Sequence, residues 1–172
     1  LTKFIFMKKS FFGLLKYSKY NYGLFNIGDY IQSCAAEQFL PNVDVLVKRD
    51  ELNINLNKTV KIIMNGWFTE SPENWPPSKN IIPLFISFHL QPKSAKVILS
   101  KKSNIKYLRQ HSPIGCRDHQ TVKMLNSKGI NAYYSFCLTS TLDLKYKSHK
   151  RNDKIILADP LYSSNLSTLK KA

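Results

Sequence analysis

The sequence has few cysteines and no long apolar run. Its three cysteines, Cys34, Cys116 and Cys137, form no C-x-x-C pair, and their odd number argues against a disulfide framework and favours a reducing compartment. Lysines interrupt the apolar runs near residue 1, and no stretch is apolar over the length that crosses a bilayer. We therefore expect a cytoplasmic protein without a signal peptide, whose contact with membranes is at most peripheral.

Several catalytic and binding motifs are also missing. The sequence contains no G-x-x-x-x-G-K-[ST], no H-E-x-x-H and no G-x-S-x-G, and its potential ligands show no metal-binding spacing. These absences predict no metal site and no cofactor.

Acidic residues are scarce, with 11 Asp and Glu against 26 Lys and Arg, which gives a net charge of +15. Such a charge favours anionic partners, among them nucleic acids, phosphorylated metabolites and acidic glycans. The lysines are spread along the chain, however, and no RNP, KH or helix-turn-helix pattern is present. A basic nucleic-acid-binding module is thus an alternative that the sequence disfavours, and we expect no nucleic-acid partner.

The 172 residues, 43% of them hydrophobic, suffice for one domain with a real core. Short apolar runs alternate with helical patterns, which is typical of a Rossmann-like parallel sheet with flanking helices. The pattern predicts strands within residues 3–15, 43–47, 60–64, 82–90, 114–116 and 130–135, and helices after residues 29, 95 and 118.

Residues 114–135 read as a βαβ unit. Asp118 is a candidate N-cap, and Gly129 stands where a left-handed residue would end the helix. Arg117 and Asp118 then lie at the carboxyl edge of the sheet, where open α/β sheets bind ligands. Arg117 could bind a phosphate or carboxylate, or the two residues could form only a cap and a structural ion pair.

Residues 26–29, Asn-Ile-Gly-Asp, precede another helix. Asp29 can cap this helix with Gln32 as its capping-box partner, and Ile31 and Phe39 belong to its apolar face. Gly28 permits the close approach of a ligand or a positive φ. The spacing alone favours a capped helix after a tight turn over an anion site.

Aromatic residues follow the run at 60–64. Trp67, Phe68 and Trp75 could stack on a sugar ring, although aromatics on such a proline-rich loop more often pin it to the core. His89 follows the next strand, where it could act as an acid, a base or an anion contact, or be a buried hydrogen-bonded histidine.

Three segments resemble the polysaccharide pyruvyl transferase family. The first is residues 114–142, which begin with Ile-Gly-Cys-Arg-Asp, continue into the helix ending at Gly129 and close with a strand at 134–142. The second is residues 26–29. The third is residues 65–68, Asn-Gly-Trp-Phe, which are similar to a subset of members. The resemblance covers most of residues 20–143.

The resemblance implies the N-terminal domain of a two-domain enzyme with a GT-B-like fold. Residues 1–144 would form this Rossmann-like domain, and residues 145–172 a linker and the start of an incomplete second domain, with a strand at 154–160. Because half of the interdomain cleft would be missing, we expect the isolated chain to show little or no pyruvyl transfer.

The implied reaction transfers a pyruvate ketal from phosphoenolpyruvate to a saccharide, free or lipid-linked, in surface or exopolysaccharide biosynthesis. A nucleotide-sugar glycosyltransferase of the same fold is the alternative enzyme. His89 and Arg117 are the expected catalytic residues. The expected substrate-binding residues are Asn26, Gly28, Asp29, Asn65, Gly66, Trp67, Arg117 and Asp118. The sequence indicates neither the acceptor sugar nor the oligomeric state.

Overall fold

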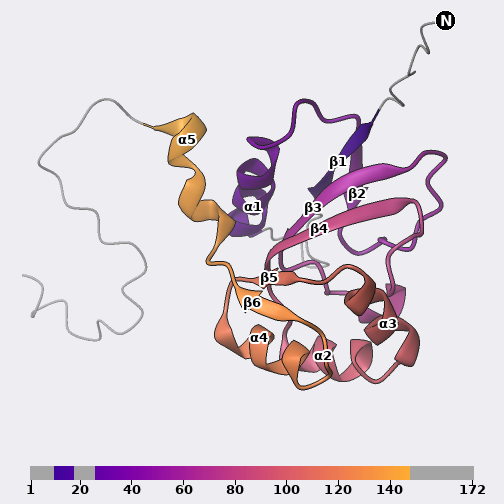
Figure 1. The fold of residues 1–172 in the computed structure, drawn as a ribbon. Coiled ribbons are helices and arrows are strands. Elements are labelled where there is room, and N and C mark those ends of the chain that lie inside the picture. Colours follow the sequence, from indigo (N-terminus) through magenta and orange to yellow (C-terminus); the bar gives the residue numbers. More distant parts are fainter. Residues whose placement is uncertain (1–9, 18–25, 148–172) are drawn as a thin grey trace, which may run out of the picture.

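The computed structural model describes residues 10–17 and 26–147, which form a parallel sheet with flanking helices (Figure 1). The six strands are β1 (Phe11–Lys16), β2 (Val45–Lys48), β3 (Val60–Gly66), β4 (Ile81–Phe88), β5 (Ile114–Cys116) and β6 (Ala132–Tyr134). Their order in the sheet is β2-β1-β3-β4-β5-β6, and every pairing is parallel. The predicted Rossmann-like class is confirmed at this level.

The helices lie on both sides of the sheet. They are α1 (Ile27–Glu37), α2 (Pro92–Ile98), α3 (Lys102–Gln110), α4 (His119–Asn126) and α5 (Asp143–Tyr146), with 3-10 turns η1 (Pro72–Asn74) and η2 (Leu138–Thr141). Figure 1 shows α1 on one side and α2, α3 and α4 on the other. Right-handed crossovers explain this arrangement, because the chain moves from β1 to β2 in one direction and from β3 to β6 in the other. The order in which the chain adds strands to the sheet reverses between β1 and β3, so the carboxyl ends of these two strands form the topological switch point.

Buried aromatic side chains dominate the core beneath β4. Phe68 and Phe88 stack with their ring centroids 4.9 Å apart, and Trp75 lies 6.2 Å from each of them. Phe68 and Trp75 are only 1% and 5% exposed. These two residues therefore pin the loop after β3 to the core, as the spacing favoured, and offer no surface to a sugar.

The predicted βαβ unit at 114–135 is confirmed. Asp118 caps α4, because its Oδ1 accepts a hydrogen bond from the backbone N–H of Thr121 at 2.7 Å. Gly129 has φ +65°, the left-handed conformation expected after a helix. Arg109 donates to the backbone carbonyls of Lys128 and Gly129, at 2.6 and 3.0 Å, and so fixes the turn that leads to β6.

The start and the apolar face of α1 differ from the prediction. Asn26 is the N-cap, since its Oδ1 accepts from the N–H of Gly28 at 2.9 Å, so the predicted cap at Asp29 and its capping box are wrong. The helix begins earlier because Asn26 is as good a cap as Asp29 and comes first. The buried face of α1 includes Ala35 and Ala36, whereas Ile31 and Phe39, which were predicted to lie on the apolar face, are exposed.

The strand predicted at 134–142 is wrong, because the chain leaves the sheet after Tyr134. Phe136 has φ +60°, which ends the extended backbone, and residues 138–141 form η2. η2 packs on α1, where Gln38 Nε2 donates to Thr141 Oγ1 at 2.7 Å.

The helical pattern at 95–110 is two helices, α2 and α3, and part of the expected linker is α5. Residues 3–9 of the first predicted strand and the strand at 154–160 lie outside the described residues.

Candidate functional site

The predicted site residues all lie where the chain leaves the carboxyl ends of the strands, an edge that we term the carboxyl rim. Asn26, Gly28 and Asp29 follow β1; Asn65, Gly66 and Trp67 end or follow β3; His89 follows β4; and Arg117 and Asp118 follow β5. Burial raises the pKa of the Tyr17 phenol well above its ordinary value, and the charges of Asp29, Arg49 and Arg117 also act on this group. The helix that follows β1 also meets the segment that follows β6, because Gln32 Nε2 lies 3.6 Å from Cys137 Sγ.

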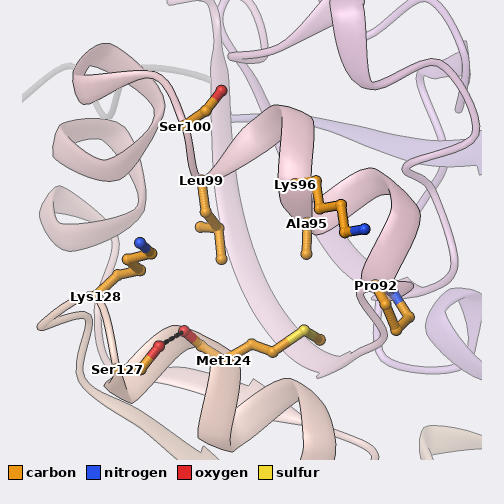
Figure 2. A pocket seen from close by; sticks show the side chains of 8 residues that line it. All are labelled: Pro92, Ala95, Lys96, Leu99, Ser100, Met124, Ser127 and Lys128. Atoms are coloured by element: carbon orange, nitrogen blue, oxygen red, sulfur yellow. Dashed lines mark hydrogen bonds between the residues drawn. The ribbon is translucent and has the colours of Figure 1, made fainter.

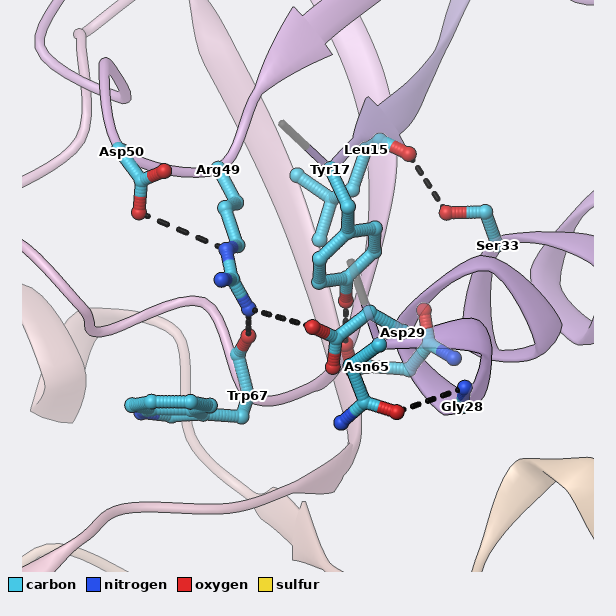
Figure 3. A network of polar contacts seen from close by, with 10 residues as sticks. Leu15, Tyr17, Gly28, Asp29, Ser33, Arg49, Asp50, Asn65 and Trp67 are labelled. Atoms are coloured by element: carbon cyan, nitrogen blue, oxygen red, sulfur yellow. Dashed lines mark hydrogen bonds and ion pairs between the residues drawn. The ribbon is translucent and has the colours of Figure 1, made fainter. Parts of the chain in front are cut away.

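Arg49, which follows β2, is the centre of a buried network at the switch point (Figure 3). Its Nη1 lies 3.2 Å from Asp29 Oδ2 and donates to the backbone carbonyl of Trp67 at 3.2 Å, while its Nε lies 3.5 Å from Asp50 Oδ1. The guanidinium also lies over the rings of Tyr17 and Trp67, 4.8 and 5.1 Å from their centroids. Its side chain is 2% exposed, so this cation is a structural group.

Asp29 and Trp67 are therefore engaged by the protein itself. Asp29 is 7% exposed and binds Arg49, and Trp67 is half-buried beneath the same guanidinium. Sequence reasoning did not identify Arg49 as the partner of Asp29, because nothing in the spacing of these residues indicates that they meet.

Asn65 and Gly66 join β3 to its neighbours. The amide of Asn65 donates to the backbone carbonyl of Gln32 at 2.9 Å, and Gly66 accepts from the N–H of His89 at 2.9 Å. Gly66 has φ +74°, and an added Cβ would lie 2.9 Å from Gln32 Cγ, so only glycine fits there. Gly28 instead has no positive φ, and an added Cβ would lie 3.0 Å from Asn26 Oδ1.

His89 and Asp118 form a half-buried pair between β4 and β5. Nδ1 of His89 lies 2.8 Å from Asp118 Oδ2, and Thr121 donates to the same carboxylate through its N–H and its Oγ1. Burial alone would raise the pKa of Asp118, but the hydrogen bonds from His89 and Thr121 outweigh it and bring the pKa below 3.8. A carboxylate on Nδ1 orients the ring and leaves Nε2 as the nitrogen that can exchange a proton with a ligand.

Arg117 lies beside this pair without being part of it. Its backbone N–H donates to the carbonyl of Phe88 at 3.1 Å, and the residue is half-buried. Within the described ranges 10–17 and 26–147, no hydrogen bond or ion pair holds its guanidinium, so the expected alternative of a structural pair with Asp118 is not found. Arg117 is thus a cation on the rim whose donors can bind an anion.

Cys137 connects the far end of the rim to α1. Its Sγ lies 3.0 Å from Thr139 Oγ1 and 3.6 Å from Gln32 Nε2. Burial tends to raise the pKa of this thiol, yet the hydrogen bonds of Thr139 and Gln32 and the charge of Arg117 lower it below its ordinary value. Cys116 is fully buried, and burial raises its pKa to about 12. All three cysteines are free thiols.

A hollow of about 410 Å³ between α2 and α4 contains none of the predicted site residues (Figure 2). Apolar side chains such as Leu99 and Met124 line it beside Lys96 and Lys128. In the described part of the chain, no cluster of His, Cys, Asp and Glu could hold a metal ion, and no helix has the length and apolarity of a membrane span.

No protein-family model, curated protein or solved structure matches the chain. The resemblance to polysaccharide pyruvyl transferases therefore stays a prediction, and so do the roles that it assigned to individual residues. The geometry describes these residues without testing those roles. Asn26, Gly28, Asp29, Asn65, Gly66 and Trp67 make contacts within the fold, and His89, Arg117 and Asp118 follow β4 and β5 at the carboxyl rim.

The buried ion pair between Asp29 and Arg49 should dominate the stability of the switch point. We expect Asp29→Asn and Arg49→Met each to lower the free energy of unfolding by about 3 kcal/mol, because each removes one member of a buried ion pair and leaves the charge of the other less compensated. The double variant should lose less than the sum of the two. Urea denaturation measures these differences.

Lys48→Met is the matched control, since Lys48 pairs with Glu51 at 2.7 Å but both side chains are about half exposed. This neighbouring variant should change stability by less than about 0.5 kcal/mol. Additive losses in the double variant, or an equal loss in Lys48→Met, would contradict the structural role of the pair.

The cap at Asp118 should make stability depend on pH. Asp118→Ala is expected to cost about 1 kcal/mol at pH 7. Because the folded-state pKa of Asp118 is below 3.8, its contribution is present at neutral pH and is lost as the pH falls through the folded-state pKa. The difference between the native chain and the variant should therefore shrink in acid. Asp143→Ala, which removes an exposed carboxylate, serves as the control, and a gap that stays constant down to pH 2.5 would exclude this role for Asp118.

Proposed function

We propose that the chain is a polysaccharide pyruvyl transferase-like protein whose carboxyl rim binds phosphoenolpyruvate at Arg117. The observation that carries this proposal is that Arg117 is half-buried, its guanidinium makes no hydrogen bond or ion pair in the described ranges, and the next residue, Asp118, holds His89. Phosphoenolpyruvate carries a phosphate and a carboxylate, and a guanidinium can bind either one through two parallel hydrogen bonds.

The reaction needs one proton donor and one anion site. A general acid protonates the methylene carbon of phosphoenolpyruvate, and two saccharide hydroxyls add in turn to the adjacent carbon, while the bond from that carbon to the phosphate oxygen breaks. The products are a pyruvate ketal and phosphate. The two hydroxyls release two protons, so one can replace the proton that the acid gave and the other accompanies the phosphate.

In this proposal His89 is the general acid and base. Its Nδ1 is fixed by Asp118, so Nε2 is the nitrogen that exchanges protons with the substrate. Arg117 binds the donor and stabilises the charge that moves onto the phosphate. Asn26 and Gly28 contribute the start of α1 on the other side of the rim, and Asp29, Asn65, Gly66 and Trp67 hold the strand ends in place.

The proposal includes the finer points that the resemblance implies. The described domain forms one wall of a GT-B-like cleft, a second domain supplies further contacts to the donor, and the acceptor is a saccharide of surface or exopolysaccharide biosynthesis. The reaction takes place in the cytoplasm and needs no metal or cofactor.

Binding of phosphoenolpyruvate to the 172-residue chain tests the anion site directly and does not require turnover. We expect Arg117→Gln to weaken the binding measured by isothermal titration calorimetry at least about tenfold, because it removes a charge-assisted pair of hydrogen bonds. Arg117→Lys should restore only part of the affinity, since a lysine cannot bind in the bidentate mode.

Lys123→Ala is the matched control, because Lys123 is an exposed cation on α4, the helix that follows Arg117. Its loss should leave the affinity almost unchanged at moderate salt. An equal effect of Lys123→Ala, or no measurable binding by the native chain, would contradict the proposal. Binding of a nucleoside diphosphate sugar in place of phosphoenolpyruvate would favour the glycosyltransferase alternative.

A further inference from the structure

Three exposed rings stack at the end of the carboxyl rim that β5 and β6 form. The ring of Tyr134, the last residue of β6, lies 4.3 Å from the ring of His119 with an interplanar angle of 30°. The ring of Phe136 lies 4.5 Å from Tyr134 on an inclined plane. Tyr134 is 37% exposed and Phe136 64%, and His119 is exposed as well. We term these three side chains the aromatic stack.

The position of Phe136 is held by the residues around it. Its φ of +60° is an unfavourable conformation for a bulky side chain. Its carbonyl accepts a hydrogen bond from Ser87 Oγ at 2.8 Å, and the N–H of Ser87 donates to Ser135 Oγ at 3.0 Å. Ser87 is fully buried at the end of β4 and itself has φ +55°. The fold thus keeps a large apolar ring in water at a fixed place, which costs free energy and suits a binding surface.

The aromatic stack adjoins the proposed donor site. Arg117 stands two residues before His119, and the N–H of Ser135, which lies between Tyr134 and Phe136, donates to the carbonyl of Cys116, the residue before Arg117, at 2.8 Å. Asp118, which orients His89, lies between Arg117 and His119 in the chain. A ligand on the aromatic stack would therefore lie beside the anion bound at Arg117 and near the proton donor.

The chemistry of the surface suits a sugar ring. The exposed rings of Tyr134 and Phe136, inclined to each other by 49°, offer an apolar surface that complements the C–H face of a pyranose, while the polar groups of the rim can meet its hydroxyls. The sequence suggested Trp67, Phe68 and Trp75 for this role. Phe68 and Trp75 are buried, and the ring of Trp67 is half-buried and lies against the guanidinium of Arg49.

We propose that the aromatic stack is the acceptor subsite, on which a pyranose ring lies against Tyr134 and Phe136 with its hydroxyls toward the donor at Arg117. This inference rests on the proposed function, because that reaction needs a saccharide beside phosphoenolpyruvate. It adds the residues that select the acceptor and places the acceptor on the side of the rim formed by β5 and β6.

The test uses the full 172-residue chain with methyl glucopyranoside and methyl galactopyranoside as probes, and adenosine 5′-monophosphate as a comparison ligand. Saturation-transfer NMR and titrations of chemical shift would measure binding to the native chain and to Tyr134→Ala and Phe136→Ala. At least one pyranoside should bind, and each substitution should weaken that binding at least about threefold.

Tyr133→Ala is the matched control, because Tyr133 is 45% exposed on the same strand but its side chain points to the opposite face of the sheet. It should leave pyranoside binding unchanged. Thermal unfolding of all three variants shows that the fold is retained, as expected for substitutions of exposed side chains.

The inference is overturned if neither pyranoside binds the native chain, if Tyr133→Ala weakens binding as much as Tyr134→Ala, or if only the nucleotide binds to the stack. The same proteins titrated with phosphoenolpyruvate separate this outcome from failure of the proposed function. If phosphoenolpyruvate binds but no pyranoside does, only the acceptor subsite is contradicted. If a pyranoside binds but phosphoenolpyruvate does not, the proposed reaction is contradicted and the aromatic stack is a sugar site.

Discussion

The buried guanidinium of Arg49 fixes the ends of the first three strands relative to one another. It follows β2, binds Asp29 in the first turn of α1, and donates to the backbone of Trp67 after β3. A buried cation requires partners on nearly all sides, since an unpaired charge in the interior is very costly. The guanidinium therefore holds the first turn of α1 and the segment after β3 against the end of β2.

The pairing of Arg49 determines which charged residues of the rim are engaged within the fold. Asp29 neutralises Arg49 within the fold, so it adds no negative potential toward a ligand. Asp118 is likewise occupied, because it caps α4 and accepts from His89. The two carboxylates that could have paired with Arg117 are thus engaged elsewhere, and its guanidinium makes no hydrogen bond or ion pair within the described ranges. The proposed anion site rests on this guanidinium more than on the overall charge of +15.

Local signals predicted most of the fold. The strands, the cap at Asp118 and the glycine at Gly129 follow from apolar runs and from residues whose backbone preferences act over a few positions. Contacts between distant segments were not predictable in this way. The bond between Asp29 and Arg49 joins residues 20 apart, and the contact of Gln38 with Thr141 joins residues 103 apart. The same limit explains the wrong strand at 134–142, since η2 forms where the chain packs against α1.

The aromatic residues show how this limit affects the prediction of a site. In the sequence, Trp67, Phe68 and Trp75 look at least as suitable for sugar binding as Tyr134 and Phe136, because the side chains are of the same kind. What separates them is exposure, which depends on the packing of β4 and α3 over the loop after β3 and on the left-handed backbone at Phe136. Neither feature has a signature in the neighbouring residues. A phenylalanine in a left-handed conformation, held by a buried serine from another strand, is recognised only when the strands are seen together. For that reason the proposed acceptor surface becomes visible only in the folded chain, whereas Arg117 and His89 are candidates from their positions after predicted strands alone.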